Sequence, residues 1–153
     1  MTGADLPHFA AMQYYALILN RTYKVKVFIA PSMLAGAKVL GLVAADPDGA
    51  TDETMQNSES WIATKAAARY DGIDVTSEAF LALNAANFQI AWRDIARIAF
   101  NPRPKWGMGN VPHSGRIVLH LRAGGSRELI LLGTQDGEAL RATLERTARA
   151  AGA

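Results

Sequence analysis

The chain has 153 residues, of which 50% are hydrophobic and 20% charged, and its formal net charge is +2. This size and composition are typical of one folded domain with its own core, and they exclude disorder along the whole chain. The absence of cysteine excludes a disulfide framework and thiolate chemistry. The small net charge is not that of a general nucleic-acid binder.

Residues 7–20 are predicted to form an N-terminal helix. Pro7 suits its first turn, and Phe9, Met12 and Leu19 fall on one helical stripe. Because this segment is apolar nearly all round, we expect it to pack against other elements on two sides.

Two strands and a second helix are predicted to follow. Residues 23–30 alternate between apolar and polar side chains, as a half-buried strand does, and residues 34–43 form a second strand with glycines that suit bends. Residues 46–58 are acidic and rich in turn residues, so we expect a loop there. Residues 59–70 are predicted to form a helix, which Gly72 can end.

The strand signal is strongest after residue 78. Strands are predicted over 79–83, 88–92, 95–100, 116–122 and 127–132. A bend at Arg93-Asp94 separates the second of these from the third, and Gly124-Gly125 forms a hairpin turn.

The chain ends in a predicted amphipathic helix. Thr134 or Asp136 caps its N-terminus, and Leu140 and Leu144 lie on the face that we expect to cover the sheet. A sheet with one apolar face needs such a cover, so the elements together indicate an α+β domain.

Three segments resemble bacterial pleckstrin-homology-like (PH-like) domains: VTSE at 75–78, FLAL at 80–83 and FQIAWRDI at 88–95. Such domains show a short hairpin, an Ile-x-Trp-x-Asp-Ile step, a longer loop, a hairpin with a glycine turn and a capping helix. The resemblance covers residues 73–151 and implies a barrel of about seven antiparallel strands in two sheets, closed by the C-terminal helix. We therefore expect one PH-like domain over residues 1–153, with an N-terminal helical extension and an acidic loop.

Charge is distributed unevenly along the chain. Between Arg93 and Arg127 there is a single acid, Asp94, whereas residues 46–59 carry acids and no Lys or Arg. The arginines indicate either a basic face or solvated strand positions that keep sheet edges apart, and we favour the second interpretation. We expect Arg149 to pair with Glu145 on the last helix.

No pattern predicts catalysis, a metal or a cofactor. His8, His113 and His120 are scattered and have no cysteine beside them, which disfavours a structural zinc site. No phosphate loop, dinucleotide fingerprint or nucleophile elbow is present. We therefore predict no catalytic residue, no metal and no cofactor.

The segment 101–115 is the most suggestive for binding. It carries Arg103, Lys105, Trp106 and His113 between prolines and glycines, and these four are our candidate binding residues. An exposed Trp beside cationic side chains suits contact with a protein, a lipid or single-stranded nucleic acid. The alternative is a loop whose Trp106 packs back onto the core.

The N-terminus and the most apolar stretch of the chain indicate where in the cell the protein is expected. Asp5 stands where a signal peptide would carry basic residues, so we expect no signal peptide. The most apolar stretch, 25–45, is interrupted by Lys26, Pro31 and Lys38, so we expect no membrane span. A cytoplasmic protein is the resulting expectation.

The sequence thus favours a non-catalytic interaction or scaffolding module. Its expected partner is a protein bound through residues 101–115 and the sheet edges; a membrane surface and a second copy of the chain are alternatives, and no specific nucleic acid is expected. The first predicted turn, Pro31-Ser32-Met33, lacks the basic cluster with which lipid-binding PH domains hold phosphoinositides.

The rival function is a small enzyme or ligand carrier with a pocket between the N-terminal helix and the sheet. Its expected lining is Tyr14, Tyr15, Tyr23, Trp61 and Tyr70.

Overall fold

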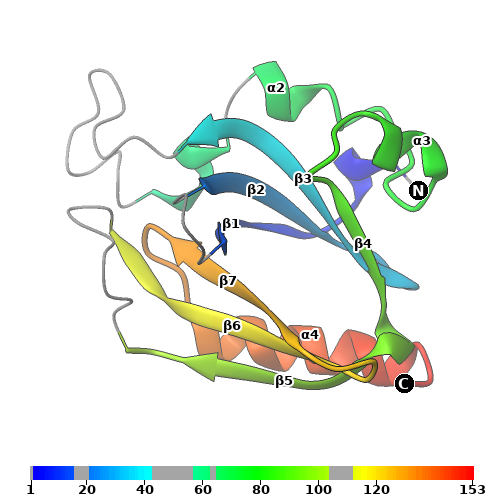
Figure 1. Ribbon diagram of the computed structural model, residues 1–153, viewed down its shortest axis with the longest axis vertical. Helices are drawn as coiled ribbons and strands as arrows, with labels where there is room; N and C mark the ends of the chain where they lie inside the picture. The colour runs from blue at the N-terminus through cyan, green and yellow to red at the C-terminus, as the bar shows by residue number, and fades with distance from the viewer. Residues whose placement is uncertain (1, 16–20, 43–56, 63–64, 104–111) are drawn as a thin grey trace.

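The computed structural model describes residues 2–15, 21–42, 57–62, 65–103 and 112–153. Its main feature is one curled sheet of seven strands in the order β4-β3-β2-β1-β7-β6-β5, with every neighbouring pair antiparallel (Figure 1). The strands are β1 (His8–Tyr15), β2 (Arg21–Ile29), β3 (Met33–Leu42), β4 (Phe88–Ala91), β5 (Ile95–Asn101), β6 (His113–Leu121) and β7 (Ser126–Leu132).

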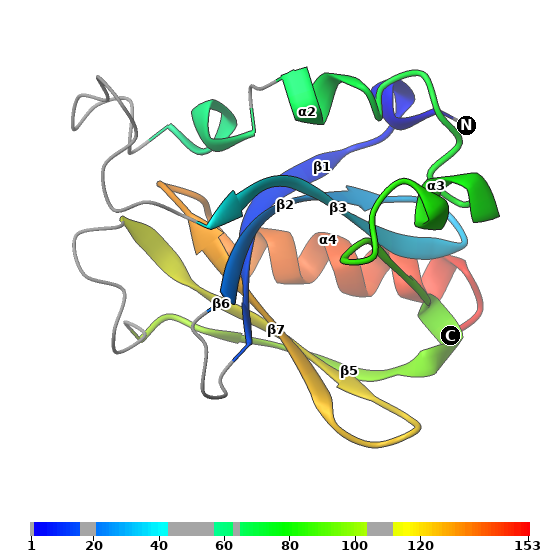
Figure 2. The same ribbon diagram turned by 45° about the horizontal axis from the view of Figure 1, so that its top comes forward.

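The helices lie on both faces of the curl. The longest, α4 (Gly137–Ala150), packs inside it against β5 and β6 (Figure 2). The connection from β3 to β4 lies on the outer face of β1–β3 and contains η2 (Ser58–Trp61), α2 (Lys65–Ala68) and α3 (Glu78–Ala82). Two more 3-10 turns complete the described elements, η1 (Gly3–Asp5) and η3 (Trp92–Asp94).

The main core fills the inside of the curl. Every strand contributes inward-facing side chains to it, and α4 adds Leu144, with Leu140 and Ala148 partly buried beside it. Two smaller clusters lie between the outer face of the sheet and the β3–β4 connection, centred on Met12 and Phe28. The first half of the sheet is therefore buried on both faces.

The predicted N-terminal helix is wrong, because its described residues form β1. This strand lies at the centre of the sheet, and Phe9, Ala10, Ala11, Met12 and Gln13 are all buried in succession. A strand covered on both faces loses the alternation that identifies strands, and Ala, Met and Gln are good helix formers. Only the expectation of packing on two sides is confirmed; residues 16–20 lie outside the described part.

The expected pair of sheets is also corrected to one continuous sheet. Strand β1 pairs with β2 along its whole length and with β7 at Ala11, Met12 and Gln13. This double pairing joins the four-stranded and three-stranded parts, so what was expected as two layers is a single half-barrel.

The predicted strand 79–83 is a short helix, α3. Ser77 caps it, because its Oγ accepts a hydrogen bond from the Phe80 N–H at 3.3 Å. Phe80 is fully buried, whereas Leu81 and Leu83 are 39% and 41% exposed. The apolar run indicated a strand because nothing in the sequence showed that only one of its large side chains enters the core.

The helix predicted over 59–70 is described as two short pieces, η2 and α2. Asn57 caps η2 through its side chain, and Ile62 leaves helical geometry with φ −118°. Ile62 and Ala67 are both buried in the outer cluster around Met12. Packing along the sheet therefore decides the path of the chain here over helix propensity. Residues 46–56 of the expected acidic loop lie outside the described part.

The remaining predicted elements are confirmed with small shifts at their ends. Trp92 anchors the bend before β5, since its buried indole Nε1 donates to the Ala30 carbonyl at 2.9 Å. Gly124 and Gly125 turn the β6–β7 hairpin with φ of 106° and 78°. Asp136, not Thr134, caps α4 by accepting from the Ala139 N–H at 3.0 Å.

Replacing Leu144 by Ala should lower the free energy of unfolding by about 2–5 kcal/mol, because its side chain is fully buried in the main core. Leu140→Ala should cost less, since Leu140 is only partly buried. Urea denaturation of both variants measures this. A cost below about 0.5 kcal/mol for Leu144→Ala would contradict the placement of α4 in the core.

Gly137→Ala should also destabilise the fold, by about 1–3 kcal/mol. A Cβ at Gly137 would lie 2.1 Å from the Phe100 ring, so either this ring or α4 would have to move. Gly72→Ala is the matched control, because nothing lies within 4 Å of a Cβ there. Equal melting temperatures for the two variants would show that Phe100 does not hold α4 at this point.

Candidate interaction site

The structure describes two of the four predicted binding residues. Arg103 follows β5 and is exposed, with its backbone N–H bonded to Asn101 Oδ1 at 3.0 Å. His113 begins β6. Lys105 and Trp106 lie outside the described residues, so a joint surface of the four stays a prediction.

His113 is placed as a packed side chain. Its ring is half-buried, and Nδ1 is covered without a hydrogen-bond partner among the described residues. Burial, and then the nearby charge of Arg116, hold the pKa of His113 below its ordinary value of 6.5. Arg116 itself forms an ion pair with Glu128 at 3.3 Å. A neutral, half-buried imidazole in this setting contributes packing and offers little surface to a partner.

An open hollow lies between β5 and the last turns of α4. We call it the arginine notch; it has a volume of about 230 Å³. Its lining is Ile95, Ala96, Arg97, Ile98, Arg122, Glu145, Ala148, Arg149 and Ala153. The register of β5 against β6 shifts between Ile95 and Arg97, which is a bulge in the edge strand. The notch therefore combines an apolar floor with arginines from a strand, a hairpin and a helix.

Local bonds hold two of these arginines. The Arg122 Nε donates to the Arg93 carbonyl at 2.7 Å, and one terminal nitrogen of Arg97 lies 3.0 Å from His120 Nε2. The single acidic side chain of the notch, Glu145, is bound by Arg141 at 2.7 Å instead of by the predicted partner Arg149. The charge of Glu145 is thus offset by an arginine from outside the notch, and the three arginines of the lining outnumber its acidic side chains.

A second groove flanks the other side of α4. It has a volume of about 460 Å³ and is lined by Asp5, Leu6, Pro7, Ile29, Pro31, Thr143, Arg146, Thr147 and Ala150. Its polar groups bond locally: Thr2 Oγ1 donates to the Asp5 carboxylate, Thr147 Oγ1 to the Thr143 carbonyl, and Arg146 to the Thr143 hydroxyl. They do not converge on a common point, as groups that bind or transform a small molecule do.

Of the aromatic lining expected for the rival pocket, the structure describes one side chain, Tyr70. Tyr70 is fully buried in the outer cluster, where its hydroxyl donates to the Lys38 carbonyl at 3.3 Å and accepts from Asn87 and Arg69. The side chains of the other four, Tyr14, Tyr15, Tyr23 and Trp61, lie outside the described part. The N-terminal helix that should have formed one wall is a central strand.

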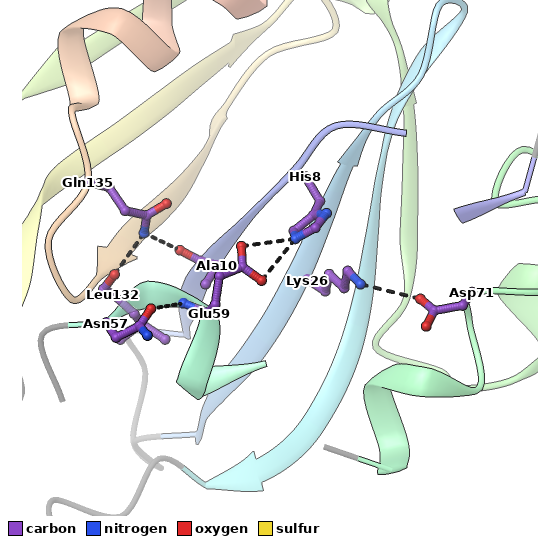
Figure 3. Close-up of polar contacts among 8 residues, drawn as sticks. All are labelled: His8, Ala10, Lys26, Asn57, Glu59, Asp71, Leu132 and Gln135. Atoms are coloured by element: carbon purple, nitrogen blue, oxygen red, sulfur yellow. Dashed lines mark hydrogen bonds and ion pairs between the residues drawn. The ribbon is translucent and has the colours of Figure 1, made fainter. Parts of the chain in front are cut away.

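Polar contacts on the outer face attach the β3–β4 connection to the sheet (Figure 3). His8 Nε2 lies 3.1 Å from a carboxylate oxygen of Glu59, and Lys26 Nζ lies 3.4 Å from Asp71. Gln135, which lies between β7 and α4, donates to the carbonyls of Ala10 and Leu132, both at 2.8 Å. Each of these side chains is engaged by a neighbour, so this face is a structural contact.

Within the described ranges, no group of three or more His, Asp or Glu could hold a metal ion. The helices that the structure describes include none of the length and apolar character needed to cross a membrane.

No family model and no curated protein matches the chain. Among solved structures, it is similar to the crystal structure of the C-terminal domain of an unknown protein from Leishmania infantum. The two are 12% identical, the match covers 94% of this chain and 83% of that one, and the TM-score is 0.52. At this identity the likeness shows the fold alone: a curled antiparallel sheet with a C-terminal helix.

The notch was missed in the sequence because its residues come from distant segments. Arg97 and Arg122 belong to the basic run, but we favoured solvated strand positions for them, and we assigned Arg149 to a pair within the helix. The one available signal was the excess of arginine after residue 93. Spacing alone does not show that β5, the β6–β7 hairpin and the end of α4 meet.

His113 should make stability depend on pH in one direction. The pKa of His113 is lowered in the folded chain, so the unfolded chain binds a proton more readily. The free energy of unfolding should therefore fall as the pH drops below about 6.5, the ordinary pKa of histidine. His113→Gln removes that titration. Urea melts of both proteins between about pH 5 and pH 8 should therefore show a flatter pH dependence for the variant. Parallel curves would refute the lowered pKa.

Proposed function

We propose that the chain is a non-catalytic interaction module with a PH-like fold that binds a protein partner at the arginine notch. The strand order, with β1 pairing both β2 and β7 and a C-terminal helix inside the curl, supports the PH-like assignment. The single observation that carries the binding proposal is the notch itself: arginines from three separate elements line one open hollow beside a sheet edge.

Strand β5 offers the backbone for such binding. It ends the sheet, and β6 is its one strand partner among the described residues. An edge strand has unpaired N–H and C=O groups along one side, to which an extended segment of another protein adds as a new strand. The bulge at Ala96 interrupts pairing at the start of β5, so the regular stretch from Arg97 onward is the expected contact.

The surface features favour a protein over a membrane. Binding to a bilayer needs apolar anchors close to basic side chains. The exposed large hydrophobic residues in the described part, Leu81 and Leu83, lie at α3 on the opposite side of the sheet from β5 (Figures 1 and 2). We propose the cytoplasm as the compartment of this interaction.

Quantitative affinity capture with matched variants tests the proposal. Arg149→Ala combined with Arg97→Ala should abolish capture of the partner while the melting temperature stays unchanged, because both side chains are exposed. Arg146→Ala is the control, since Arg146 is an exposed arginine on the other flank of α4. A Trp106→Ala variant tests whether the 101–115 segment adds to the same surface.

Capture that survives in the double variant but fails in Trp106→Ala would move the surface to that segment and contradict the notch. Equal capture by all variants would contradict both the arginine notch and the 101–115 segment as the binding surface. If the captured protein is a second copy of the chain, the partner is the chain itself, and light scattering will show the oligomer.

A further inference from the structure

We propose that the segment bound at the arginine notch is acidic, with carboxylate side chains that contact Arg97, Arg122 and Arg149. This inference rests on the proposed function and adds the chemistry of the partner. Each of the three arginines comes from a different element, and the only acidic side chain of the notch is bound by Arg141. A guanidinium presents a planar fork of donors that matches the two oxygens of a carboxylate.

The arginines keep donors available for such a ligand. Arg122 uses Nε for the Arg93 carbonyl, and its terminal nitrogens have no partner among the described residues. Arg149 likewise has no side-chain partner in the described part of the chain. The contact with His120 occupies one terminal nitrogen of Arg97. Because Arg97 and Arg122 are held at one point each, less conformational entropy is lost when a partner binds.

The floor of the notch adds a second requirement. Ile95, Ile98 and Ala148 line the notch between the charged side chains, and of these Ile95 and Ile98 belong to the buried core, where they are 5% and 7% exposed. Successive side chains of an extended segment point in opposite directions. A segment that lies along β5 would therefore place apolar side chains toward this floor and acidic side chains beside the arginines, which predicts an alternating acidic and apolar pattern.

The lining disfavours single-stranded nucleic acid as the source of the anion. Proteins that hold such strands stack bases on aromatic rings beside their cationic groups. None of the residues that line the notch is aromatic. A lipid headgroup is disfavoured because the exposed large hydrophobic residues of the described part, Leu81 and Leu83, are not among the residues that line the notch.

Selection from a random short-peptide display library tests the inference without knowledge of the partner. We expect enriched peptides to be rich in Asp and Glu with apolar residues between them. A synthetic peptide of the enriched sequence should lose about tenfold in affinity for Arg97→Gln/Arg149→Gln and keep its affinity for the control Arg146→Gln. Its affinity should fall as salt rises, because exposed charge pairs are screened.

Charge reversal sharpens the test. Arg149→Glu should weaken the binding of the acidic peptide. It should strengthen the binding of the same peptide with Lys in place of Glu. A library that yields no peptide, peptides without an acidic bias, or peptides indifferent to the notch variants would overturn the inference. Notch-dependent binding to vesicles that contain phosphoinositide, with no peptide selected, would overturn it in favour of a phosphate headgroup.

The two proposals fail in different ways. If capture of the partner depends on the notch but the selected peptides are neutral, the notch is the binding site and the acidic chemistry is wrong. If capture is indifferent to the notch, the proposed function fails, whatever the peptides show.

Discussion

The pairing of β1 with both β2 and β7 is the constraint on which the rest of the fold depends. It makes one sheet from a four-stranded and a three-stranded part, and it bends them toward each other. Inward side chains from all seven strands consequently meet in one cluster, which α4 completes with Leu144. Because β1 is central, its outer face must also be covered, and the β3–β4 connection does this with Ile62 and Ala67.

The position of α4 within this curl creates the candidate site. The helix packs against β5 and β6, with Gly137 allowing close approach of the Phe100 ring. Strand β5 bulges at Ala96, and residues on both sides of the bulge line the arginine notch together with the last turns of α4.

The sequence located strand β6 and helix α4 closely, because each shows one apolar face. Strands β2 and β7 were also located closely, although Phe28, Ile130 and Leu132 are buried on their outer faces. Strand β1 was mistaken for a helix because both of its faces are buried, and α3 for a strand because Leu81 and Leu83 are apolar yet exposed. The notch depends on long-range contacts between β5, the β6–β7 hairpin and α4, which local patterns do not encode.

The uneven charge of the sequence gains a structural reason in this arrangement. Acids of the β3–β4 connection contact basic side chains of the sheet: Glu59 lies against His8, and Asp71 against Lys26. The arginines after residue 93 lie on β5, the β6–β7 hairpin and α4, which this connection does not cover. The one acidic side chain that lines the notch, Glu145, is bound by Arg141. Ion pairs and hydrogen bonds within the chain therefore engage these acids of the β3–β4 connection, whereas arginines remain at the edge of β5, which is the surface that we propose for an acidic partner.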